Sequence, residues 1–570
     1  VITMSDASKA YSAETVEGGI VLKQPDGTYL QQSKGYASFY AKTDIADATV
    51  WTVDFDEAGH VRLYSEDLGG LYFSYDAKGY KEFAGYTLGD GYVMPYIYID
   101  SKVSTGEVLN VSDVTVDASA CTATIPVVSN AATGWRVRCH DSWIKSYTSG
   151  GEGNGDNILN VSATVGAALA QAQGLLDGTF LGADGLLRDY IGEIPTPKDC
   201  AEARPNAMGW WSPIENGPMF TGPYLAAVCE RARRSGAESD RAACRRMAAG
   251  LVRAASVSDV KGMVVRGFAT DGHSHYPLGS EDQTLPWFYG LWAYAQSGLP
   301  SAAERDGIVA KMTEVADALA ANGWGCPCDG RFKGQDRGRF ASGRLVFRAA
   351  AHYLFILRAM ADVTGSPAWR ARYETACGEE QSRSGLTRLE VCAKGYVTDI
   401  GKFAVEPGGL WIYVCAQACL RALARMDADD TRRAAYLAGL GANAERARKF
   451  FAMAAKFDNS TERPFRYANW RTGYRWRDQP TQKEADAVAG TGDRKILGSR
   501  KWFERSHMTT PLSACAIVAF AGEARDRAAI EEVLRHYDYS TLNISEFFLA
   551  ELAWYALPAP AESKEKETVR

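Results

Sequence analysis

The sequence predicts a multidomain chain in which N-terminal all-β modules are followed by an all-α region folded as an (α/α)6 toroid. Short runs of β-branched and aromatic residues fill the first 163 residues, whereas apolar residues recur at helical spacing afterwards. The helical part alternates between short and long connections, which is typical of paired antiparallel helices. We place a β-rich module at residues 1–103, a second β module at 104–163, the toroid at 164–560 and a charged tail at 561–570.

The composition excludes several classes of protein. Of the 570 residues, 46% are hydrophobic and 23% are charged, which excludes a disordered or collagen-like chain. No apolar run approaches the roughly 18 residues that cross a bilayer, so we expect no transmembrane segment. The N-terminus has no basic-then-apolar leader, which fits either a mature exported chain or a cytoplasmic one. The twelve cysteines are too sparse for a disulfide framework, and we expect no metal site and no cofactor.

The net charge of −6 conceals two different parts of the chain. Residues 1–163 hold 11 basic and 21 acidic residues, whereas the remaining 407 residues hold 52 basic and 48 acidic residues. The basic residues of the second part are mostly arginine, with 39 arginines against 13 lysines. Such asymmetry can indicate an anionic partner, and the alternative is that two types of module differ in composition.

In the first module, strands are expected where β-branched and aromatic residues cluster between glycine and aspartate turns. The predicted strands are residues 28–30, 49–53, 60–64 and 71–75. We find no cluster of catalytic residue types in this module. Its aromatic side chains suit a β core, and the alternative is a surface that contacts carbohydrate.

The second module contains, in order, a β-branched strand, a tryptophan strand, a Ser-Trp-Ile segment, a loop rich in glycine and asparagine, and a final strand. The matching segments are residues 109–112, 123–127, 135–137, 142–144, 150–156 and 158–163. In this order they resemble the BACON modules found in many bacterial carbohydrate-active enzymes. The resemblance implies a small β-sandwich that acts as a spacer or a glycan contact. It also implies a periplasmic, cell-surface or secreted protein.

Apolar spacing and capping signals predict twelve helices in the toroid region. They span about residues 163–175, 216–233, 239–256, 282–297, 302–321, 342–360, 368–380, 406–424, 430–455, 508–522, 525–538 and 544–556. Long loops precede the second, fourth, sixth, eighth and tenth of them. The even-numbered helices are apolar nearly all round, so we expect them to form an inner ring within six amphipathic helices. The long loops would then open on one face, at the N-terminal ends of the inner helices.

The second long loop carries the densest set of candidate site residues, because two of the seven histidines lie there among three carboxylates. We expect Asp282 and Asp271 to be catalytic candidates. The expected substrate contacts of this loop and its helix are Arg266, His273, His275 and Tyr289. The alternative for the carboxylates is a capping box, in which Ser280 is the N-cap residue and Gln283 reaches back to it.

Three further loops open on the same predicted face. Glu406 precedes Pro407, and proline suits the first turn of a helix. The Glu406 carboxylate is therefore expected at the mouth of the toroid, where the long loops open. The alternative is that its charge only interacts favourably with the helix dipole. The aromatic, arginine and histidine side chains expected to contact a substrate are Trp210, Trp211, Trp411, Trp470, Arg471, Arg475, Trp476 and His507. The alternatives are core packing for the tryptophans and a solvated lid for the arginine-rich loop.

A toroid with acids and aromatic residues at its mouth resembles the six-hairpin glycosidase superfamily and the toroid polysaccharide lyases. The resemblance covers about 400 residues and includes the segments 290–294 and 408–411. It implies an exported carbohydrate-active enzyme. The arginine-rich mouth favours a glycan that contains uronic acids or other anionic groups, and the acidic balance of the whole chain argues against a nucleic acid partner.

Three functions are compatible with these features. A glycoside hydrolase needs one carboxylic acid and one carboxylate, for which we favour Asp282 and Glu406, with Asp271 in reserve. A polysaccharide lyase would use a histidine or tyrosine base while an arginine neutralises the uronate, and the candidate bases are His273, His275, Tyr276 and His507. The third function is glycan binding without catalysis, as in a protein of an uptake system.

Overall fold

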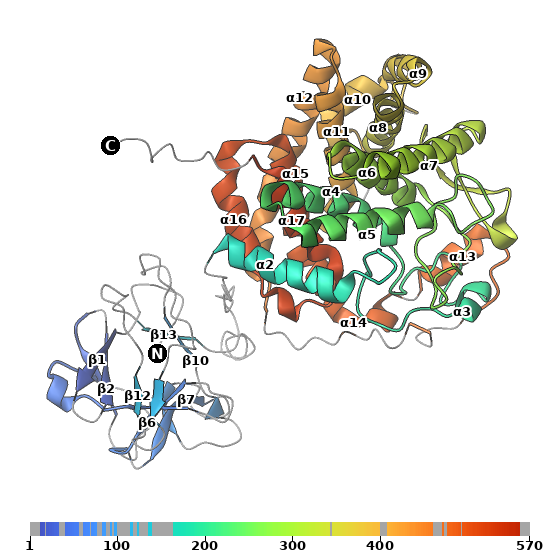
Figure 1. Cartoon of the computed structure of the whole chain (residues 1–570). Helices are drawn as coiled ribbons and strands as arrows, with labels where there is room; N and C mark the ends of the chain where they lie inside the picture. The colour runs from blue at the N-terminus through green and yellow to red at the C-terminus, as the bar shows by residue number, and fades with distance from the viewer. Residues whose placement is uncertain are drawn as a thin grey trace. The chain divides into compact units, whose positions relative to one another are not determined.

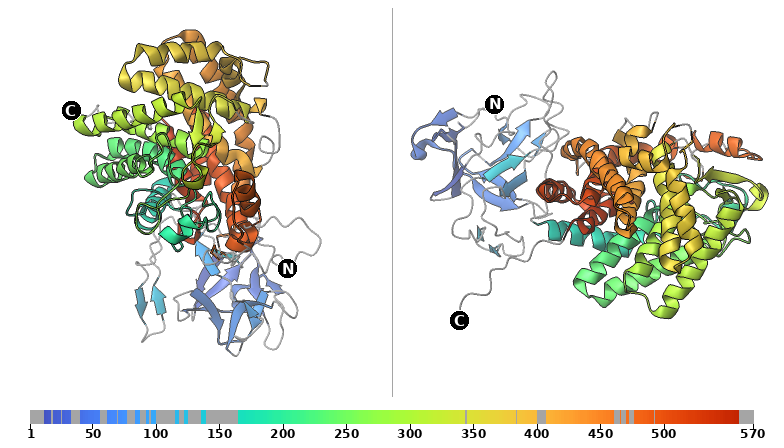
Figure 2. Two further views of the ribbon diagram at one scale, coloured as in Figure 1. Left: turned by 90° about the vertical axis from the view of Figure 1, so that its right-hand side faces the viewer. Right: turned by 90° about the horizontal axis from the view of Figure 1, so that it is seen from above.

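The computed structural model of the chain contains two compact units, residues 1–159 with 458–460 and residues 160–457 with 461–570. Strands dominate the first unit and helices the second (Figure 1 and Figure 2). In the first 163 residues the structure describes residues 12–16, 19–24, 26–32, 40–55, 61–68, 70–76, 83–86, 92–93, 96–99, 115–117, 122–124 and 135–138. Beyond them it describes residues 164–558 except 343–344, 383, 400–406, 460–464, 466–469, 472–475 and 492.

The first unit contains two antiparallel sheets around a small apolar core. Their strand orders are β1-β2-β3-β4 and β5-β6-β7-β8, and β9 also pairs with β7. The bounds are β1 Ser12–Val16, β2 Gly19–Lys23, β3 Tyr29–Gln31, β4 Tyr40–Lys42, β5 Thr52–Phe55, β6 Val61–Ser65, β7 Leu71–Asp76, β8 Phe83–Tyr86 and β9 Tyr92–Val93. Trp51 is fully buried against Phe73, with 5.6 Å between the ring centroids. The strands expected near residues 29, 52, 62 and 73 are confirmed.

The predicted second β module is described only in part. Strands β11 (Thr115–Asp117) and β12 (Thr122–Thr124) pair with each other, and β13 (Trp135–Arg138) pairs with β10 (Tyr96–Ile99). The β10–β13 pair joins residues from both sides of the boundary predicted at residue 104. Of the segments that resemble a BACON module, residues 109–112, 125–127, 142–144, 150–156 and 158–163 lie outside the described residues.

The helical unit contains a helix in each of the twelve predicted segments, so these helix predictions are confirmed. The helices are α2 Val165–Leu175, α4 Gly217–Ser235, α5 Glu238–Ala254, α6 Glu281–Gln296, α7 Ala302–Ala321, α8 Val346–Thr364, α9 Pro367–Gly378, α11 Val414–Met426, α12 Asp430–Ala447, α15 Thr510–Ala521, α16 Arg527–Arg535 and α17 Phe548–Ala556. The eighth predicted helix begins later than expected, because a 3-10 segment, Pro407–Tyr413, precedes α11.

The long connections contain short elements that the sequence did not predict. They are the helices α3 Pro197–Ala201, α10 Arg388–Lys394, α13 Gln482–Ala489 and α14 Asp493–Glu504, and the hairpin strands β14 Gly325–Pro327 and β15 Asp336–Arg339. Helices α3, α10 and α13 each begin with a capping box. Local side-chain caps therefore stabilise short helices that have no long apolar stripe.

The long helices are of two kinds. In α8 and α15 almost every residue is buried, whereas α5 and α7 bury residues on one side only. The amphipathic helices pack on the buried ones, with α5 on α4, α9 on α8 and α12 on α11. The expected alternation of apolar and amphipathic helices is confirmed for these pairs.

Helices α4 and α6 cross with no side chain between them at Gly222 and Gly290. A Cβ atom at residue 222 would lie 1.9 Å from the carbonyl oxygen of Pro286, and one at residue 290 would lie 2.6 Å from the Cα atom of Gly222. Because these neighbours are backbone atoms, only glycine fits at either position. The close crossing brings the first turns together, where the Met219 N–H donates to Gln283 Oε1 at 3.1 Å.

Candidate active site

A small cavity lies where the N-terminal ends of six long helices meet. Residues at the starts of α4, α6, α8 and α11, and residues just before or within the first turns of α15 and α17, line it. Its charged and hydrogen-bonding lining residues include Asp282, Arg348, His352, Thr509 and Glu546. The cavity has a volume of about 30 Å³, far below the roughly 300–1,000 Å³ of ordinary small-molecule pockets. A larger ligand would therefore lie at its mouth.

Two adjacent carboxyl groups share Arg348: that of Asp282, which lines the cavity with Arg348, and that of Glu281, which lies behind it and is not part of the lining. Nη2 of Arg348 donates to Asp282 Oδ1 at 2.9 Å and also to Glu281 Oε1. Burial acts to raise the pKa of Asp282, but the guanidinium groups of Arg348 and Arg266 outweigh it and hold the pKa below its usual value. Burial raises the pKa of Glu281 despite Arg348, and the charge of Asp282 adds to the rise. The site thus separates the two pKa values, so Glu281 takes up a proton more readily than Asp282.

Glu546 brings a carboxylate from another helix to the same cavity. Arg505 donates to Glu546 Oε1 from Nε at 2.9 Å and from Nη2 at 2.6 Å, and the Thr509 hydroxyl donates to Oε2 at 2.6 Å. The Arg505 guanidinium also lies 5.4 Å from the centroid of the Trp411 ring. One arginine thereby fixes both a carboxylate and an indole that line the cavity.

His352 contributes a neutral imidazole to the lining. It lies one helical turn after Arg348 on α8 and is buried. Burial, and then the charge of Arg348, lower the pKa of His352 well below its usual value, so the ring is uncharged at neutral pH. Its Nε2 atom has no hydrogen-bond partner among the described residues. An uncharged ring nitrogen with no partner among the described residues can exchange a hydrogen bond with a ligand in the cavity.

The buried guanidinium of Arg266 connects α6 to the first long loop. Nη1 donates to the carbonyl oxygen of Glu215 at 3.2 Å, and Nη2 donates to Ser280 Oγ at 3.0 Å. Ser280 is the N-cap residue of α6, but its side chain makes no capping hydrogen bond. The side chain of Gln283 instead accepts from the Met219 N–H. The capping box considered for Ser280 and Gln283 is therefore wrong, because both side chains contact other segments.

Asp189 and Glu215 form a buried acidic pair near this arginine. The backbone and side-chain N–H groups of Asn216 donate to the two oxygens of Asp189 at 2.8 and 2.6 Å. Glu215 Oε2 accepts the backbone N–H of Trp211 at 2.8 Å, and Trp211 has a left-handed backbone with φ of 72°. Burial, and then the charge of Glu215, raise the pKa of Asp189 to about 8, so this carboxyl is protonated at neutral pH.

The raised pKa of Asp189 predicts a pH-dependent stability. The neutral carboxyl favours the folded state below its unfolded pKa of about 4, and this contribution is lost as the pH rises through about 8. Asp189→Asn, which cannot ionise, should therefore flatten the fall in melting temperature between those two pH values. Asp271→Asn changes an exposed carboxyl whose pKa is lowered, so it should keep the slope of the parent. Parallel curves for Asp189→Asn and the parent would contradict this assignment.

The other candidates of the second long loop do not line the cavity. Asp271 is exposed, and its oxygens accept the N–H groups of His273 and Ser274 and the Ser274 hydroxyl. His275 Nε2 lies 2.9 Å from Asp329 Oδ2, and its Nδ1 lies 3.0 Å from the carbonyl oxygen of His273. The structure thus uses Asp271 and His275 in local contacts that shape the loop.

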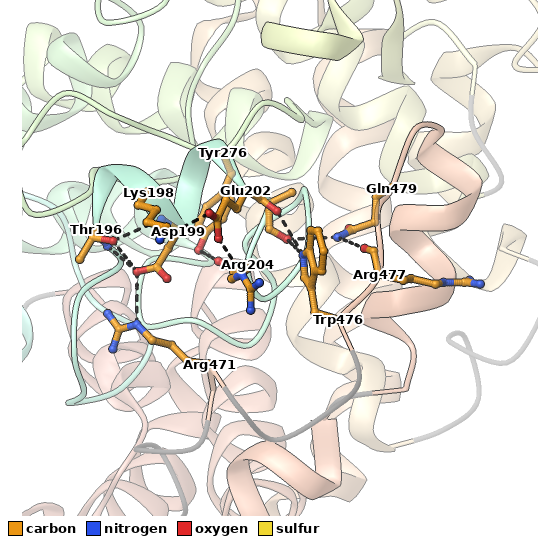
Figure 3. Close-up of polar contacts among 11 residues, drawn as sticks. Thr196, Lys198, Asp199, Glu202, Arg204, Tyr276, Arg471, Trp476, Arg477 and Gln479 are labelled. Atoms are coloured by element: carbon orange, nitrogen blue, oxygen red, sulfur yellow. Dashed lines mark hydrogen bonds and ion pairs between the residues drawn. The ribbon is translucent and has the colours of Figure 1, made fainter.

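The fifth long loop docks on the first through its arginine and tryptophan residues. The Nε of Arg471 lies 3.2 Å from Asp199 Oδ2 (Figure 3), and the Arg471 guanidinium also contacts Glu193. The ring of Trp470 is fully buried beneath the same guanidinium at 4.1 Å, and its N–H donates to the Glu193 carbonyl at 3.0 Å. These contacts place Trp470 and Arg471 between two loops.

Trp476 makes the second part of this docking. Its indole N–H donates to the carbonyl oxygens of Glu202 and Ala203 at 3.1 and 3.2 Å (Figure 3). The guanidinium of Arg204 lies 4.6 Å from the centroid of the Trp476 ring, and Gln479 Nε2 also donates to the Ala203 carbonyl, at 3.1 Å. Trp476 is still 36% exposed, so one face of its ring lies at the surface.

The paired tryptophans of the first long loop are half-buried and contact charged groups. The guanidinium of Arg337 lies 5.7 Å from the Trp210 ring centroid, and the Lys501 ammonium lies 4.5 Å from that of Trp211. The Trp211 indole N–H donates to the carbonyl oxygen of Ala489 at 2.6 Å. The two rings are 6.1 Å apart in an edge-on arrangement.

The remaining predicted contacts lie in other places. His507 packs on Phe503, with 4.9 Å between the ring centroids, and its Nδ1 lies 3.1 Å from the Phe503 carbonyl oxygen. Tyr289 lines a second cavity, which is described below. Glu406 and Arg475 lie outside the described residues.

Several residues of the site were not expected from the sequence. Glu546 carries the same signal as Asp282, an acidic residue at the start of an inner helix, and this signal would have found it. Arg348 and His352 lie on a predicted helix, but a run of apolar residues surrounds them. Asp189 lies in an irregular segment between α2 and α3, where no periodic pattern draws attention to it.

Metal binding and membrane insertion have no support among the described residues. These residues contain no group of three His, Cys, Asp or Glu side chains arranged to hold a metal ion. Within the same part of the chain, no helix combines the length and apolar character needed to span a membrane.

In comparisons with known proteins, no protein-family model, curated protein or solved structure matched this chain.

Proposed function

We propose that the helical unit is an (α/α)6 toroid whose mouth is the active site of an exported carbohydrate-active enzyme. The toroid is supported by the contacts of α4 with α6, α6 with α8, α8 with α11, α11 with α15, α15 with α17, and α17 with α4. These contacts return to the helix from which they start. Six buried helices in such a cycle, covered by amphipathic partners, form six helical hairpins around one axis. The small cavity then lies on that axis.

The reaction that the site supports best is hydrolysis of a glycosidic bond. The observation that carries this proposal is that Arg348 holds two carboxyl groups whose pKa values are displaced in opposite directions. Hydrolysis needs a protonated acid for the leaving oxygen and an ionised carboxylate that activates water or attacks the sugar. Glu281 suits the acid and Asp282 the carboxylate. Glu546, fixed by Arg505, is placed to orient the sugar or the water.

We propose an anionic substrate, such as a glycan that contains uronic acid, because two arginines lie at or next to the cavity. Arg348 lines the cavity beside Asp282, Arg505 holds the lining carboxylate of Glu546, and guanidinium groups bind carboxylates in a fork geometry. The aromatic ring of Trp411 also lines the cavity and suits a sugar face. The substrate ring would lie at the mouth, because a cavity of about 30 Å³ is too small to hold a sugar ring.

Glu281→Gln tests the proposed acid. The amide cannot donate a proton to the leaving oxygen, so turnover of a natural oligosaccharide should fall by about 10²–10⁴-fold. An aryl glycoside with an acidic phenol leaves without such help, so the same variant should lose much less activity on it. The check is the ratio of the two kcat/KM values relative to the parent. Equal losses on both substrates would show that Glu281 is not the acid.

A specific observation keeps elimination as a second candidate reaction. The neutral ring of His352 lines the same cavity beside Arg348, and a lyase needs an uncharged base together with a cation that neutralises the uronate. The two reactions differ in their products on a panel of uronate-containing oligosaccharides. Elimination gives an unsaturated sugar that absorbs in the near ultraviolet, whereas hydrolysis gives a new reducing end without that absorbance. Saturable binding with no product from any glycan would indicate a binding protein instead.

A further inference from the structure

A second and larger cavity lies at the opposite ends of the same helices. Its volume is about 350 Å³, within the range of small-molecule sites, and it is lined by the C-terminal halves of α4, α6, α11 and α17. On α6, Pro286 is the last residue that lines the first cavity and Tyr289 is the first residue that lines the second. On α4 the corresponding residues are Pro223 and Ala226. About one helical turn therefore separates the two cavities along each helix.

The lining of this second cavity is strongly basic. It contains Arg233, Arg234, Arg421 and Arg425, against the single carboxylate of Glu230. Arg233 and Arg234 both pair with Glu230, at 2.9 and 2.8 Å. The four arginines and one glutamate give the lining a net charge of +3, and Arg421 and Arg425 have no carboxylate partner within it.

Arg421 is half-buried, whereas the other three arginines of the lining are exposed. Its Nη1 donates to the carbonyl oxygen of Ala556 at 2.6 Å, and the guanidinium lies 5.7 Å from the Phe520 ring centroid. Among the described residues it forms no ion pair, and its other N–H groups have no hydrogen-bond acceptor. Burial, and then the neighbouring charge of Arg425, lower the pKa of Arg421 to about 10. Holding a cation in this place is costly unless an anion joins it.

A purely structural role explains only part of the cluster. Arginines near helix C-termini offset the helix dipole, and Arg234 donates to the carbonyl oxygens of Tyr555 and Leu557 at 3.1 and 3.0 Å. The same role accounts for the contact of Arg421 with α17. It does not account for a cavity of this size between the arginines, or for Arg425, which is exposed beside Arg421.

The geometry points to a binding site in this cavity for a small organic anion that carries carboxylate or phosphate groups, with Arg421 and Arg425 as its principal contacts. Planar guanidinium groups bind both kinds of oxygen anion. The rings of Tyr289, Trp292 and Tyr555 supply apolar walls for the rest of such a molecule. This inference does not depend on the proposed hydrolase activity, because it concerns the other end of the helices and is tested by binding.

The test is calorimetric titration of the full chain at low salt with citrate, inorganic phosphate and, as a neutral control, glucose. We expect saturable binding of citrate or phosphate with one site per chain, and none of glucose. Arg421→Gln and Arg425→Gln should each weaken that binding by about tenfold or more. Arg425 is exposed, so its variant should fold even if Arg421→Gln does not.

The matched control is Arg241→Gln, which removes an exposed arginine of α5 that does not line the cavity. It should bind the anion as the parent does, with the melting temperature of each variant recorded to verify folding. Binding of citrate alone or of phosphate alone, lost in the cavity variants, would support the site and identify the anion class. Absence of binding, or equal losses in Arg425→Gln and Arg241→Gln, would overturn it.

Discussion

Asp282→Asn should reduce kcat/KM by about 10²–10⁴-fold on every substrate that the parent cleaves, including aryl glycosides. The asparagine keeps the size of the side chain but cannot accept a proton or attack a sugar. The contact with Arg348 at 2.9 Å can still form through the amide oxygen, so the fold should change little. Initial rates on an oligosaccharide and on an aryl glycoside provide the measurement.

The matched control for this prediction is Asp271→Asn. Asp271 lies in the long loop that leads to α6, and among the described residues its oxygens accept hydrogen bonds from the turn that it forms. This variant should keep close to the parent activity. If Asp282→Asn retained full activity while Asp271→Asn lost it, the active site would have to be sought in the exposed turn.

Arg231→Met should cause the largest loss of stability, about 3–5 kcal/mol. Arg231 is 3% exposed and pairs with three carboxylates, those of Asp240 and Asp177 at 2.9 Å and that of Glu551 at 2.5 Å. The Tyr224 hydroxyl completes the network by donating to Glu551 at 3.0 Å. Methionine fills a similar volume but leaves the three acids without their shared cation.

The pH dependence of Arg231→Met follows from Glu551. Burial already raises the pKa of Glu551 to about 7, and loss of Arg231 removes the main charge that lowers it. A carboxyl with a raised pKa favours the folded state when it is protonated, so the stability of the variant should fall as the pH rises from about 4 through 7 and should go on falling above 7, where the parent has already levelled off. Thermal unfolding at several pH values measures both effects.

Arg245→Met is the control for this second prediction. It also breaks an arginine–glutamate pair, with Glu238, but the two side chains are 46% and 72% exposed. Exposed pairs of this kind contribute little to stability, because water screens the two charges. Similar melting temperatures for the Arg231 and Arg245 variants would show that the buried network does not hold α4, α5 and α17 together.

The helices were predictable because their packing depends on a local pattern. Each of the twelve segments buries one face or nearly all of its surface, and that requirement is visible in the spacing of apolar residues. The short helices α3, α10 and α13 were not predicted, because side-chain caps rather than apolar stripes define them. Local hydrogen bonds leave a much weaker pattern in the sequence than a buried face does.

The candidate site was predictable only in part, for a related reason. Asp282, which lines the small cavity, could be singled out because an acid at the start of a buried helix stands next to a long loop. Its partner Arg348 comes from a helix more than 60 residues away, and only the folded chain brings them to 2.9 Å. Trp470 and Trp476 have the composition of a sugar-binding loop, but the structure uses their N–H groups in contacts between loops. Composition does not distinguish these two uses of an aromatic side chain.

The crossing of α4 and α6 limits how this protein can diverge. Neither Gly222 nor Gly290 can acquire a side chain unless the two backbones separate, and separation would move the first turn of α6, which carries Glu281 and Asp282, away from the first turn of α4. Distant descendants that keep the chemistry should therefore retain Glu281, Asp282, Pro286 and Gly290 at fixed spacing, written E-D-x3-P-x3-G, even after their loops have become unrecognisable. A search for this short motif would identify related proteins whose overall sequence similarity is too low to detect.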